Sequence, residues 1–594
     1  MKSGVRIVDG STDFSYGCDS SRTPTIRSAE NPNGLPRNGL SWLVNGTVRT
    51  SGILTRTGWQ PLAVVDTGTG IYQGGFMYEP LNALPYLILS IGGRLLQVRV
   101  DSDNSVVDMT GSFANPPNNP IHHFVQGDQF MVMQTGDNVT LPLFWDGTTL
   151  KRSNGITGNL TNPNINQIPA AGPMVYYQQR LWYGQGRHYS AGDIIGGPSG
   201  TAPYQNRDSI LSVTENPLVI GGDGFAIPTN AGNIRALAYP ITLDQALGQG
   251  PLFVFTPTQI FAQSVPITRT DWISANSNNQ PLQQVIMNGQ GAVGDRCVVP
   301  VNGDLFYQDR LPSINSFNMS LRYFGQWGNR PISNNIIRAL QFNDRSLMRT
   351  ARGVYFDNRL YQSILPKQTG RGVVFQALAV LDTDPISTLK QDQLPAWEGI
   401  GQGLQILDMF TGDFGGLHRM FLVILSKIDN SIQVWESDIA TRFDNGDNRT
   451  TMLIEWPAFD GSSQGSSLFE TKELDGATIW ADKMFGTIDF TLTYRVDQSP
   501  CEYPWATWQK CFARDSCEDT AENICYPLTT FREGYGIPMG MPKPKSVCQQ
   551  GVKRPSTLGF SFQPVLRVKG WARIRGIELY MITRDLAPYQ DLIC

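Results

Sequence analysis

The stretch LILSIGGRLLQVRV, residues 87–100, reads as two β-strands joined by a tight turn. Apolar residues dominate both sides of the central Gly92 and Gly93, and glycine adopts the positive φ angles of tight turns at low cost. The same pattern recurs along the chain: an apolar strand, a turn of Gly, Asp or Asn, and a second apolar strand. The further copies are HFVQGDQFMVMQT (123–135), PLFWDGTTLKRS (142–153), MVYYQQRLWYGQG (174–186), VPVNGDLFYQDR (299–310), VYFDNRLYQSIL (354–365) and LVILSKIDNSIQVWES (422–437).

The spacing of these hairpins predicts a β-propeller. Once the stretch 211–263, which has no clear copy, is allowed for, the turn centres lie about 35 to 75 residues apart, roughly the period of four-stranded blades with insertions. Radial repetition also protects strand edges that would otherwise invite aggregation. We therefore expect an irregular propeller over residues 61–460.

Composition supports a mainly β chain. Only 16% of the 594 residues are charged, while 60 glycines and 38 prolines favour turns. The helical signals in ITLDQALGQG (241–250) and SNNIIRALQF (333–342) are short. Because no strand alternates with a long helix, a doubly wound α/β fold is disfavoured.

The composition of the sequence changes near residue 460, where a Gly/Ser-rich linker follows. We expect residues 461–594 to form a C-terminal β-sandwich-like domain with a Cys-rich insertion at 501–548. Residues 1–60 are expected to supply an N-terminal arm and the first blade strands. The predicted fold class is mainly β: an irregular β-propeller with insertions plus this C-terminal domain.

Charge and hydropathy give no targeting signal. The formal net charge of −4 produces no strong global field, so any contact with nucleic acid must be local. The N-terminus lacks the apolar run of a signal peptide, and the longest apolar stretches, near Leu84 and Met420, are far shorter than the ~20 residues that span a bilayer. We expect a soluble protein that starts in the cytoplasm, with no membrane-spanning segment.

The eight cysteines leave three interpretations. None of the spacings in the C-terminal cluster has the C-x₂₋₄-C form of structural zinc sites, and no histidine lies nearby, so zinc is disfavoured. Disulfides formed after release into an oxidising medium remain an alternative. Buried free thiols are favoured, because unpaired cysteine behaves as a small hydrophobe. The clustered cysteines are Cys501, Cys511, Cys517, Cys525 and Cys548, and the isolated ones are Cys18, Cys297 and Cys594.

Three stretches carry a resemblance to a known family. They are NGTVRTSGILTRTGW (45–59) with Asn45, Gly52 and Gly58, RCVVPVNGDLFYQDRLPSINSF (296–317) with the turn Asn302 and Gly303, and RSLMRTARGVYFDNRLYQSILP (345–366). These stretches resemble the β-propeller tail proteins of bacteriophages, whose best-described members form the nozzle of short-tailed phages. The sequence departs from the pattern after Arg310, where Leu311 and Pro312 stand in place of a turn glycine.

The resemblance implies a structural component of a phage tail. In that role, identical copies close a homo-oligomeric ring, a hexamer, that forms the distal DNA-exit channel and a docking surface. The implied partners are a tail adaptor protein, tail fibres or spikes, and transient double-stranded DNA in the lumen. The implied location is the virion tail, assembled in the host bacterial cytoplasm. The alternative is a propeller of the virion that binds or cleaves host-surface carbohydrate, with some of the 13 tryptophans and 20 tyrosines as platforms.

Arginines suggest where such a protein makes contacts. Arg49 and Arg56 lie in a stretch where apolar and polar residues alternate, which places them on the polar face of a blade hairpin. We expect them to take part in blade packing or a subunit interface rather than to bind a ligand. In VLRVKGWARIRGIE (565–578), charges at alternate positions predict that four basic residues share one strand face: Arg567, Lys569, Arg573 and Arg575.

Three interpretations of this basic face remain open, because burying such charges unpaired costs several kcal/mol each. The face is solvated, or it meets an acidic neighbour, or it contacts DNA phosphates in the channel. The acidic stretch RDSCEDTAEN (514–523) is a candidate partner, within the chain or in the next subunit. A strong basic lining would hinder the passage of DNA.

Catalytic motifs are missing from the sequence. It contains no G-x-S-x-G elbow, Walker loop, H-E-x-x-H or EF-hand loop. The neighbours His122 and His123 would point to opposite faces of a strand and so would not chelate a metal together. We expect a protein that is not an enzyme, with no catalytic residue, metal or cofactor. The aspartates of the hairpin turns have a sufficient structural reason to be there: Asp128, Asp146, Asp304, Asp357 and Asp429.

Overall fold

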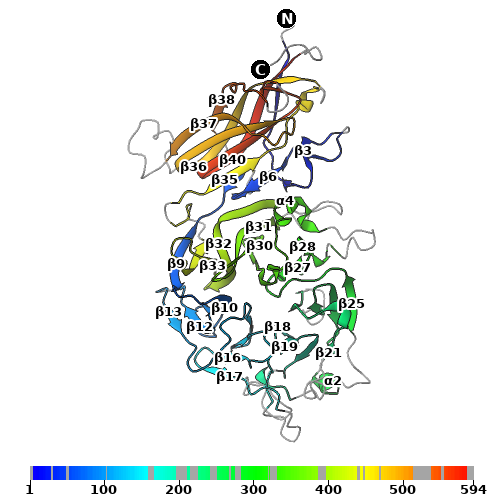
Figure 1. Cartoon of the computed structure of the whole chain (residues 1–594), viewed down its shortest axis with the longest axis vertical. Coiled ribbons are helices and arrows are strands. Elements are labelled where there is room, and N and C mark those ends of the chain that lie inside the picture. Colours follow the sequence, from blue (N-terminus) through cyan, green and yellow to red (C-terminus); the bar gives the residue numbers. More distant parts are fainter. Residues whose placement is uncertain are drawn as a thin grey trace.

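The computed structural model of the chain describes most of its length. The described residues are 4–28, 31–48, 52–101, 103–157, 166–194, 210–214, 225–240, 251–265, 269–274, 283–318, 320, 331–384, 396–437, 442–445, 448–466, 470–512, 537–549 and 554–584. Figure 1 shows a ring of small sheets in the lower part of the molecule and a sheet of long strands above it.

Five antiparallel sheets follow one another around the ring in the described part of the chain, and each is a simple meander (Figure 1). They are arranged as propeller blades, which confirms the mainly β propeller fold. Their strands are β10 Tyr72–Tyr78, β11 Tyr86–Ile91, β12 Arg94–Val98, β13 Val106–Asp108; β14 His123–Gly127, β15 Phe130–Gln134, β16 Leu143–Trp145, β17 Leu150–Arg152; β18 Met174–Tyr177, β19 Arg180–Gln185, β20 His188–Ala191, β21 Phe225–Ala226; β22 Ala236–Ala238, β23 Leu252–Phe255, β24 Gln259–Gln263, β25 Gln283–Asn288; and β26 Val299–Val301, β27 Asp304–Asp309, β28 Ser313–Ser316.

The hairpins predicted from the sequence are all present. Two-residue turns join β11 to β12 at Gly92 and Gly93, and β26 to β27 at Asn302 and Gly303. Both residues of each turn have positive φ, between 47° and 82°. Such turns twist with the strands they join, which explains why Gly and Asn stand at these positions.

A larger sheet completes the ring. Its meander runs through β29 Gly353–Phe356, β30 Arg359–Thr369, β31 Gly372–Asp382, β32 Trp397–Phe414, β33 Leu417–Leu425 and β34 Ile432–Ser437. Strand β9, Trp59–Asp66, then pairs antiparallel with β34. The ring is therefore closed by a strand from the N-terminal part of the chain, which pairs with the last strand of the meander.

The long strands form a curled sheet continuous with the ring. Strands β36 and β40 pair along nearly their whole length, and both bend where φ is positive, at Lys483 and Gly486 in β36 and at Gly570 in β40. The sheet also contains strands from the N-terminal region. We call the following set the terminal sheet: β1 Arg6–Ser11, β6 Trp42–Val44, β7 Gly46–Thr47, β8 Ile53–Thr55, β35 Thr451–Glu455, β36 Lys472–Val496, β37 Tyr503–Phe512, β38 Ile537–Met541, β39 Leu558–Gly559 and β40 Phe562–Thr583.

The N-terminal residues differ from the expectation for 1–60. Strand β1 pairs with β40, β6 with β35, and β8 with β40, so these strands complete the terminal sheet instead of a first blade. Strand β9 joins the ring, and β6 also pairs with β32 of the ring. The reason is physical: period-two alternation marks a half-buried strand but does not determine which sheet the strand pairs with.

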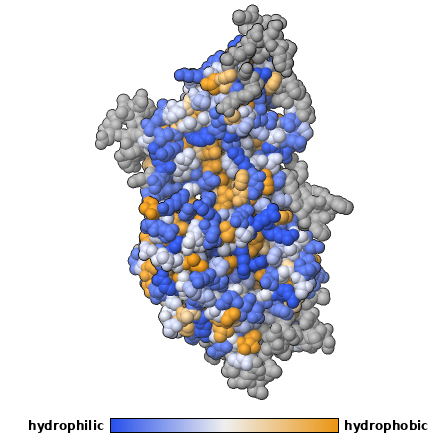
Figure 2. All heavy atoms as spheres, in the orientation of Figure 1, coloured by the Kyte–Doolittle hydropathy of each residue, from blue (hydrophilic) through white to orange (hydrophobic). Residues whose placement is uncertain are grey.

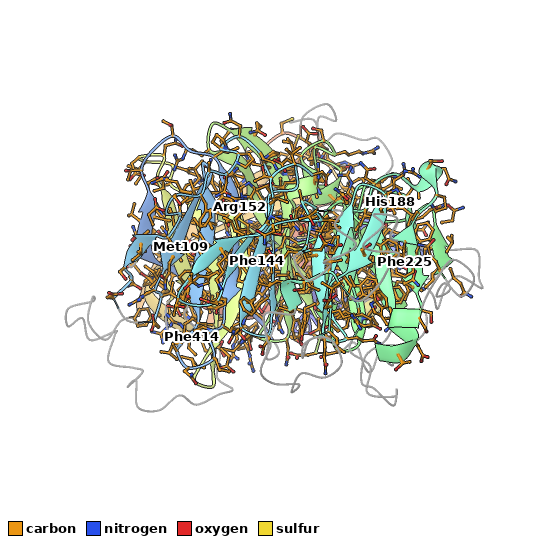
Figure 3. The ribbon with its side chains drawn as sticks, turned by 90° about the horizontal axis from the view of Figure 1, so that it is seen from below. Met109, Phe144, Arg152, His188, Phe225 and Phe414 are labelled. Atoms are coloured by element: carbon orange, nitrogen blue, oxygen red, sulfur yellow. The ribbon has the colours of Figure 1, made fainter. Side chains whose placement is uncertain are left out.

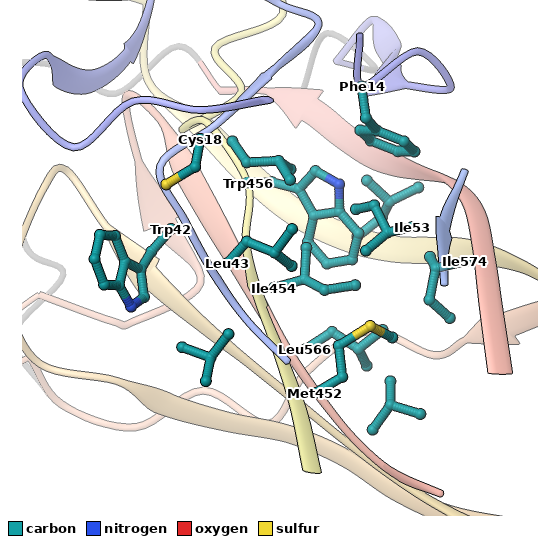
Figure 4. Close-up of a cluster of buried hydrophobic side chains, with 14 of the residues drawn as sticks. Phe14, Cys18, Trp42, Leu43, Ile53, Met452, Ile454, Trp456, Leu566 and Ile574 are labelled. Atoms are coloured by element: carbon teal, nitrogen blue, oxygen red, sulfur yellow. The ribbon is translucent and has the colours of Figure 1, made fainter. Parts of the chain in front are cut away.

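Buried apolar side chains from both ends of the chain form one core. Figure 4 shows Trp42, Leu43 and Ile53 of the N-terminal strands packed with Ile454 and Leu566 of β35 and β40. At about 25 cal/mol per Å² of buried apolar surface, a core of this kind is the main stabilising contribution to the terminal sheet.

Apolar cores also fill the space between the blades. Phe144 and Phe225, labelled in Figure 3, belong to one buried cluster that spans three successive sheets of the ring. Hydrophilic residues cover most of the face in Figure 2, where hydrophobic residues lie mainly along the middle of the molecule.

The remaining elements are short. Parallel pairs are formed by β2 Gly17–Cys18 with β5 Gly39–Leu40, and by β3 Thr23–Ile26 with β4 Gly34–Leu35. The helices whose bounds are described include η3 Thr229–Ala231, α2 Arg269–Ser274, η4 Ile332–Ile336, α4 Ile337–Leu340, η5 Met348–Thr350 and η7 Ser462–Gln464. Within the described ranges, no helix is long and apolar enough to cross a membrane.

Candidate functional site

A cavity of about 270 Å³ lies at the junction of the ring and the terminal sheet. Its wall is formed by β7, β8 and β40 on one side and by β31, β32 and β33 on the other, and it is mostly apolar. The charged and aromatic residues that line it are Arg56, Trp59, Asp357, Arg359, Tyr361, Glu398 and Trp571.

Arg56 is held in this wall by a fork of hydrogen bonds. Its Nη1 and Nη2 donate to Oδ1 and Oδ2 of Asp444 at 2.9 and 2.7 Å, and its Nε donates to Oδ1 of Asn45 at 3.1 Å. Asn45 has φ of 55° and also donates from Nδ2 to the Thr451 carbonyl of β35. A bidentate Arg–carboxylate pair is both strong and directional, so Arg56 acts in packing, at a bond between sheets.

Arg359 and Glu398 form a second ion pair of the cavity wall. They are 3% and 2% exposed, and Nη2 of Arg359 lies 3.0 Å from Oε1 of Glu398. The same oxygen accepts hydrogen bonds from the Thr47 hydroxyl and the Val48 amide of the N-terminal segment. Burial raises the pKa of Glu398, and the charge of Arg359 opposes that shift. The pair ties β30 and β32 to the segment that leads into β8.

Two glycines of the resemblance are explained by close packing at this junction. A Cβ on Gly58 would collide with the backbone of Phe443, and a Cβ on Gly52 would lie 3.0 Å from the Ile574 carbonyl oxygen and 3.1 Å from Cγ of Arg573. The structure therefore brings Asn45, Gly52, Arg56 and Gly58 together. Arg49 lies outside the described residues.

The predicted basic face is largely paired within the chain. Arg573 is 2% exposed and donates from Nε and Nη2 to the two carboxylate oxygens of Asp482, both at 2.7 Å. Arg575 lies 3.8 Å from the same carboxylate, and Arg567 lies 2.9 Å from Glu502.

Asp482 of β36 and Glu502 of the segment after β36 are thus acidic partners of the basic face. The predicted acidic partner, stretch 514–523, lies outside the described residues. Burial opposes ionisation of Glu502, but hydrogen bonds and charge from Arg567 and Arg495 lower its pKa to about 2. Lys569 remains exposed. Sequence reasoning missed these partners because they are distant along the chain.

A polar cluster lies where the innermost strands of the ring meet, and we call it the hub. The first strands of successive sheets contact one another there, such as β10 with β14 and β14 with β18. Oδ2 of Asp408 accepts a 2.8 Å hydrogen bond from the Tyr72 hydroxyl, and Oδ1 lies 3.1 Å from Nε of Arg352 and 3.5 Å from Nη2 of Arg296. Burial, followed by the charge of Asp408, raises the pKa of Tyr72.

The two adjacent histidines have separate structural roles. His122 is buried, contacts Ser90 and Gln73, and has its pKa lowered by burial to about 3. Nδ1 of His123 lies 2.6 Å from Oδ2 of Asp295. Their environments differ, as neighbouring positions on a strand require. The sequence offered no signal for the His123–Asp295 pair, since 172 positions separate the two residues.

The expectation of buried thiols holds for some of the described cysteines. Cys18 and Cys297 are buried, and burial raises the pKa of Cys297 to about 11, whereas Cys501 is half-buried and Cys548 is exposed. Asp146 and Asp429 accept hydrogen bonds from backbone amides two residues further on, as expected for turns. Cys517, Cys525 and Cys594 lie outside the described residues. Over the described ranges, no group of three or more His, Cys, Asp or Glu side chains is placed to hold a metal ion.

Comparison with known proteins gives matches to solved structures. No family model matches the chain, and no curated protein matches it. BBS1N, solved in complex with ARL6DN, shares 9% identity at a TM-score of 0.34, covering 65% of this chain and 99% of that one. Raptor of Chaetomium thermophilum shares 10% at a TM-score of 0.36, covering 65% of this chain and 29% of that one.

A third match is the β-propeller domain of Cps50 (Swd1) from Myceliophteria thermophila. It shares 8% identity at a TM-score of 0.33, covering 64% of this chain and 99% of that one. None of these three is a virion protein by its name. Likenesses of this size carry no conclusion about function.

Proposed function

We propose that this chain is a structural subunit of the tail of a short-tailed bacteriophage, part of the nozzle ring through which DNA leaves. The proposal rests on the resemblance of residues 45–59, 296–317 and 345–366 to phage tail propellers. It also draws on the position of residues 45–59 in the structure. A tail subunit that withstands mechanical force needs firm contacts between its parts, and residues 45–59 lie where the ring meets the terminal sheet.

The observation that carries the proposal is the double pairing of β6. Val44 is the register partner of Ile400 in β32 of the ring and of Leu453 in β35 of the terminal sheet. The backbone of one short strand is thus hydrogen-bonded to both parts of the molecule. The ion pairs Arg56–Asp444 and Arg359–Glu398 flank this strand, and such pairs resist displacement because breaking a buried one costs several kcal/mol.

In the proposed ring, six copies meet through two different patches on each subunit, as cyclic symmetry requires. The adaptor and the tail fibres or spikes dock on its outer surfaces, and double-stranded DNA passes through the lumen. The internal pairing of Arg567, Arg573 and Arg575 suits a passage that must not hold DNA tightly.

The carbohydrate-specific alternative has less support. It needs aromatic platforms on the surface, whereas the largest fully buried side chains include Trp182, Trp272, Trp397 and Trp456. These tryptophans contribute to the cores, where aromatic rings bury large areas.

Electron microscopy of phage particles tests the proposal. Antibodies raised against the purified chain are added to particles from a lysate of the phage that encodes it, with pre-immune serum as the control. We expect label at the distal end of the tail, and cryo-EM reconstruction should place six copies around the channel. Particles that carry no label, or label confined to the head, would contradict the proposal.

A biochemical arm separates the two functions. The purified chain is mixed with the adaptor of the same phage and sized by sedimentation, and it is incubated separately with host polysaccharide. The proposal expects ring-sized particles and no released sugar. Release of sugar at a rate above that of heat-denatured protein would favour the alternative.

A further inference from the structure

The hub contains more positive than negative charge. Four arginines surround it, Arg235, Arg296, Arg349 and Arg352, against two aspartates, Asp295 and Asp408. Arg296 and Arg352 are within ion-pair distance of Asp408, at 3.5 and 3.1 Å. Asp295 is paired with His123 at 2.6 Å.

The two other arginines lack such partners among the described residues. Arg235 and Arg349 line one small cavity together with the pair of His123 and Asp295. Hydrogen bonds and ion pairs of the described chain leave both guanidinium groups without a carboxylate. Burial lowers the pKa of Arg235, and the nearby charge of Arg349 lowers it further. The two side chains therefore repel each other across the cavity.

Asp295 lines the same cavity but is already engaged by other groups. The charges of His123, Arg352 and Arg296 already hold its pKa well below the usual range, although burial acts in the opposite direction. Its carboxylate is thus ionised and already lies beside His123, Arg352 and Arg296. Among the described residues, no other carboxylate forms an ion pair with Arg235 or Arg349.

The cavity has the position and size of a small ion site. It lies where the inner strands begin, since its walls come from the residues just before β14, β18, β22, β26 and β29. Its volume is about 10 Å³, the space of one water-sized sphere. Arg235 is half-buried and Arg349 is exposed, so an ion can reach the cavity from solvent.

We propose that Arg235 and Arg349 bind a small inorganic anion at the end of the propeller hub, with one acceptor atom of that anion in the cavity. A chloride ion fills the cavity alone, whereas a phosphate places one oxygen in it and the rest at the mouth. Bound there, the anion offsets the repulsion between the two guanidinium groups and links two sheets of the ring. This inference does not depend on the proposed tail function.

Thermal unfolding in different anions tests the site. The full chain is melted at constant ionic strength in sodium gluconate, with increasing sodium chloride or sodium phosphate in its place. We expect the unfolding midpoint to rise and to saturate with chloride, phosphate or both, while gluconate is too bulky to enter. If both anions give a saturating shift, the bound ion or one of its atoms lies inside the cavity. If only phosphate does, the anion binds mainly at the opening of the cavity.

Substitutions assign the effect to these residues. Arg349→Gln should raise the anion concentration that gives the half-maximal shift about tenfold, which corresponds to about 1.4 kcal/mol of lost interaction. Arg235→Gln with Arg349→Gln should abolish the shift, and both variants should melt above the wild type in gluconate because the repulsion is gone. Arg345→Gln is the matched control: it is an exposed arginine four positions from Arg349 that does not line the cavity.

Several outcomes overturn the inference. The wild type shows no saturating shift, or Arg345→Gln and the double variant shift alike, which indicates a general salt effect. Crystals soaked in sodium bromide give an independent readout that does not require a stable double variant. We expect an anomalous peak from bromide between the guanidinium groups of Arg235 and Arg349. If bromide ions occupy other surface positions fully but no peak lies between these two groups, the result contradicts the site.

Discussion

At the scale of single residues, Gly58 shows how closely the N-terminal segment approaches the chain it crosses. Its φ is not in the left-handed region, so any residue could adopt its backbone conformation. The restriction comes from the neighbouring backbone of Phe443, which occupies the space a Cβ would need. Backbone gives way less readily than the end of a side chain, so even a methyl group has to displace one of the two segments.

Gly58→Ala is therefore expected to lower the free energy of unfolding by about 3 kcal/mol or more, as overpacking against backbone does. Chemical denaturation followed by tryptophan fluorescence measures this change. Gly370→Ala is the matched control, because a Cβ there meets no atom within 4 Å. It should change stability by less than about 1 kcal/mol, and a loss equal to that of Gly58→Ala would show that the close approach has no energetic role.

A buried carboxyl group in the ring predicts a pH dependence. Burial raises the pKa of Asp309 to about 6, although the amide of Arg310 and other backbone amides favour the charged form. The folded state therefore holds this proton to a higher pH than the unfolded state does. The sign follows from linkage: the contribution is most favourable below the unfolded pKa of about 4 and is lost as the pH rises to about 6.

Asp309→Asn should stabilise the protein at pH 7.5 by up to about 2–3 kcal/mol relative to the wild type, and this difference should disappear below about pH 4. Glu502→Gln is the opposite-sign control, since the folded pKa of Glu502 is lowered to about 2. It should destabilise at pH 7.5 and lose that effect as the pH falls from about 4.5 toward 2. Denaturant midpoints across this pH range check both curves, and an Asp309→Asn effect independent of pH would contradict the assignment.

At the scale of elements, the hairpins and the closing strand differ in what determines them. A turn such as Asn302 and Gly303 depends on its own two residues, so local sequence is enough to predict the hairpin β26–β27. The pairing of β9 with β34 depends on contacts between distant segments. Alternation predicts strands within residues 48–59, but it contains no information about the partner strand, so the pairing of β8 with β40 could not be predicted.

The closing strand predicts where the ring is most sensitive. Val434 of β34 is fully buried and faces Ala63 of β9 and Val423 of β33. Val434→Asp would place a charge in the core between the closing strands and the β10–β13 sheet. We expect a loss of more than about 3 kcal/mol, measured by denaturation, because the charge has no partner there.

Val107→Asp provides the comparison for this prediction. Val107 is an exposed valine on β13, the last strand of the β10–β13 sheet. The same substitution there should change stability by no more than about 0.5 kcal/mol. Equal losses at the two positions would mean that the closing strand is not a special point of the ring.

At the scale of the whole molecule, the ring and the terminal sheet share strands and cannot be separated by cutting one linker. The chain enters the terminal sheet with β1, crosses to the ring at β9 and returns with β35. The composition predicts a boundary near residue 460. It does not predict that N-terminal strands join the terminal sheet, because those strands pair with segments far along the chain. The same holds for the ion pairs of the junction, such as Arg56 with Asp444, 388 positions apart.

This sharing predicts that the two parts unfold together. We expect one transition in calorimetry, coincident with the loss of near-UV circular dichroism. Val44→Pro removes hydrogen-bonding capacity from the strand between Ile400 and Leu453 and should separate the transition into two. Two transitions in the wild type itself would show that the junction does not couple the parts.

The pairing of β1 with β40 has a consequence for biosynthesis. Val5 donates to the Thr583 hydroxyl, and these residues are 578 positions apart. While the ribosome is still translating, the blades can assemble in order, but β1 has no partner strand until β40 emerges from the exit tunnel. Its apolar side chains must wait while all the blades are made, so the newly made chain is most exposed to misassociation, and most in need of a chaperone, at the moment just before β40 emerges.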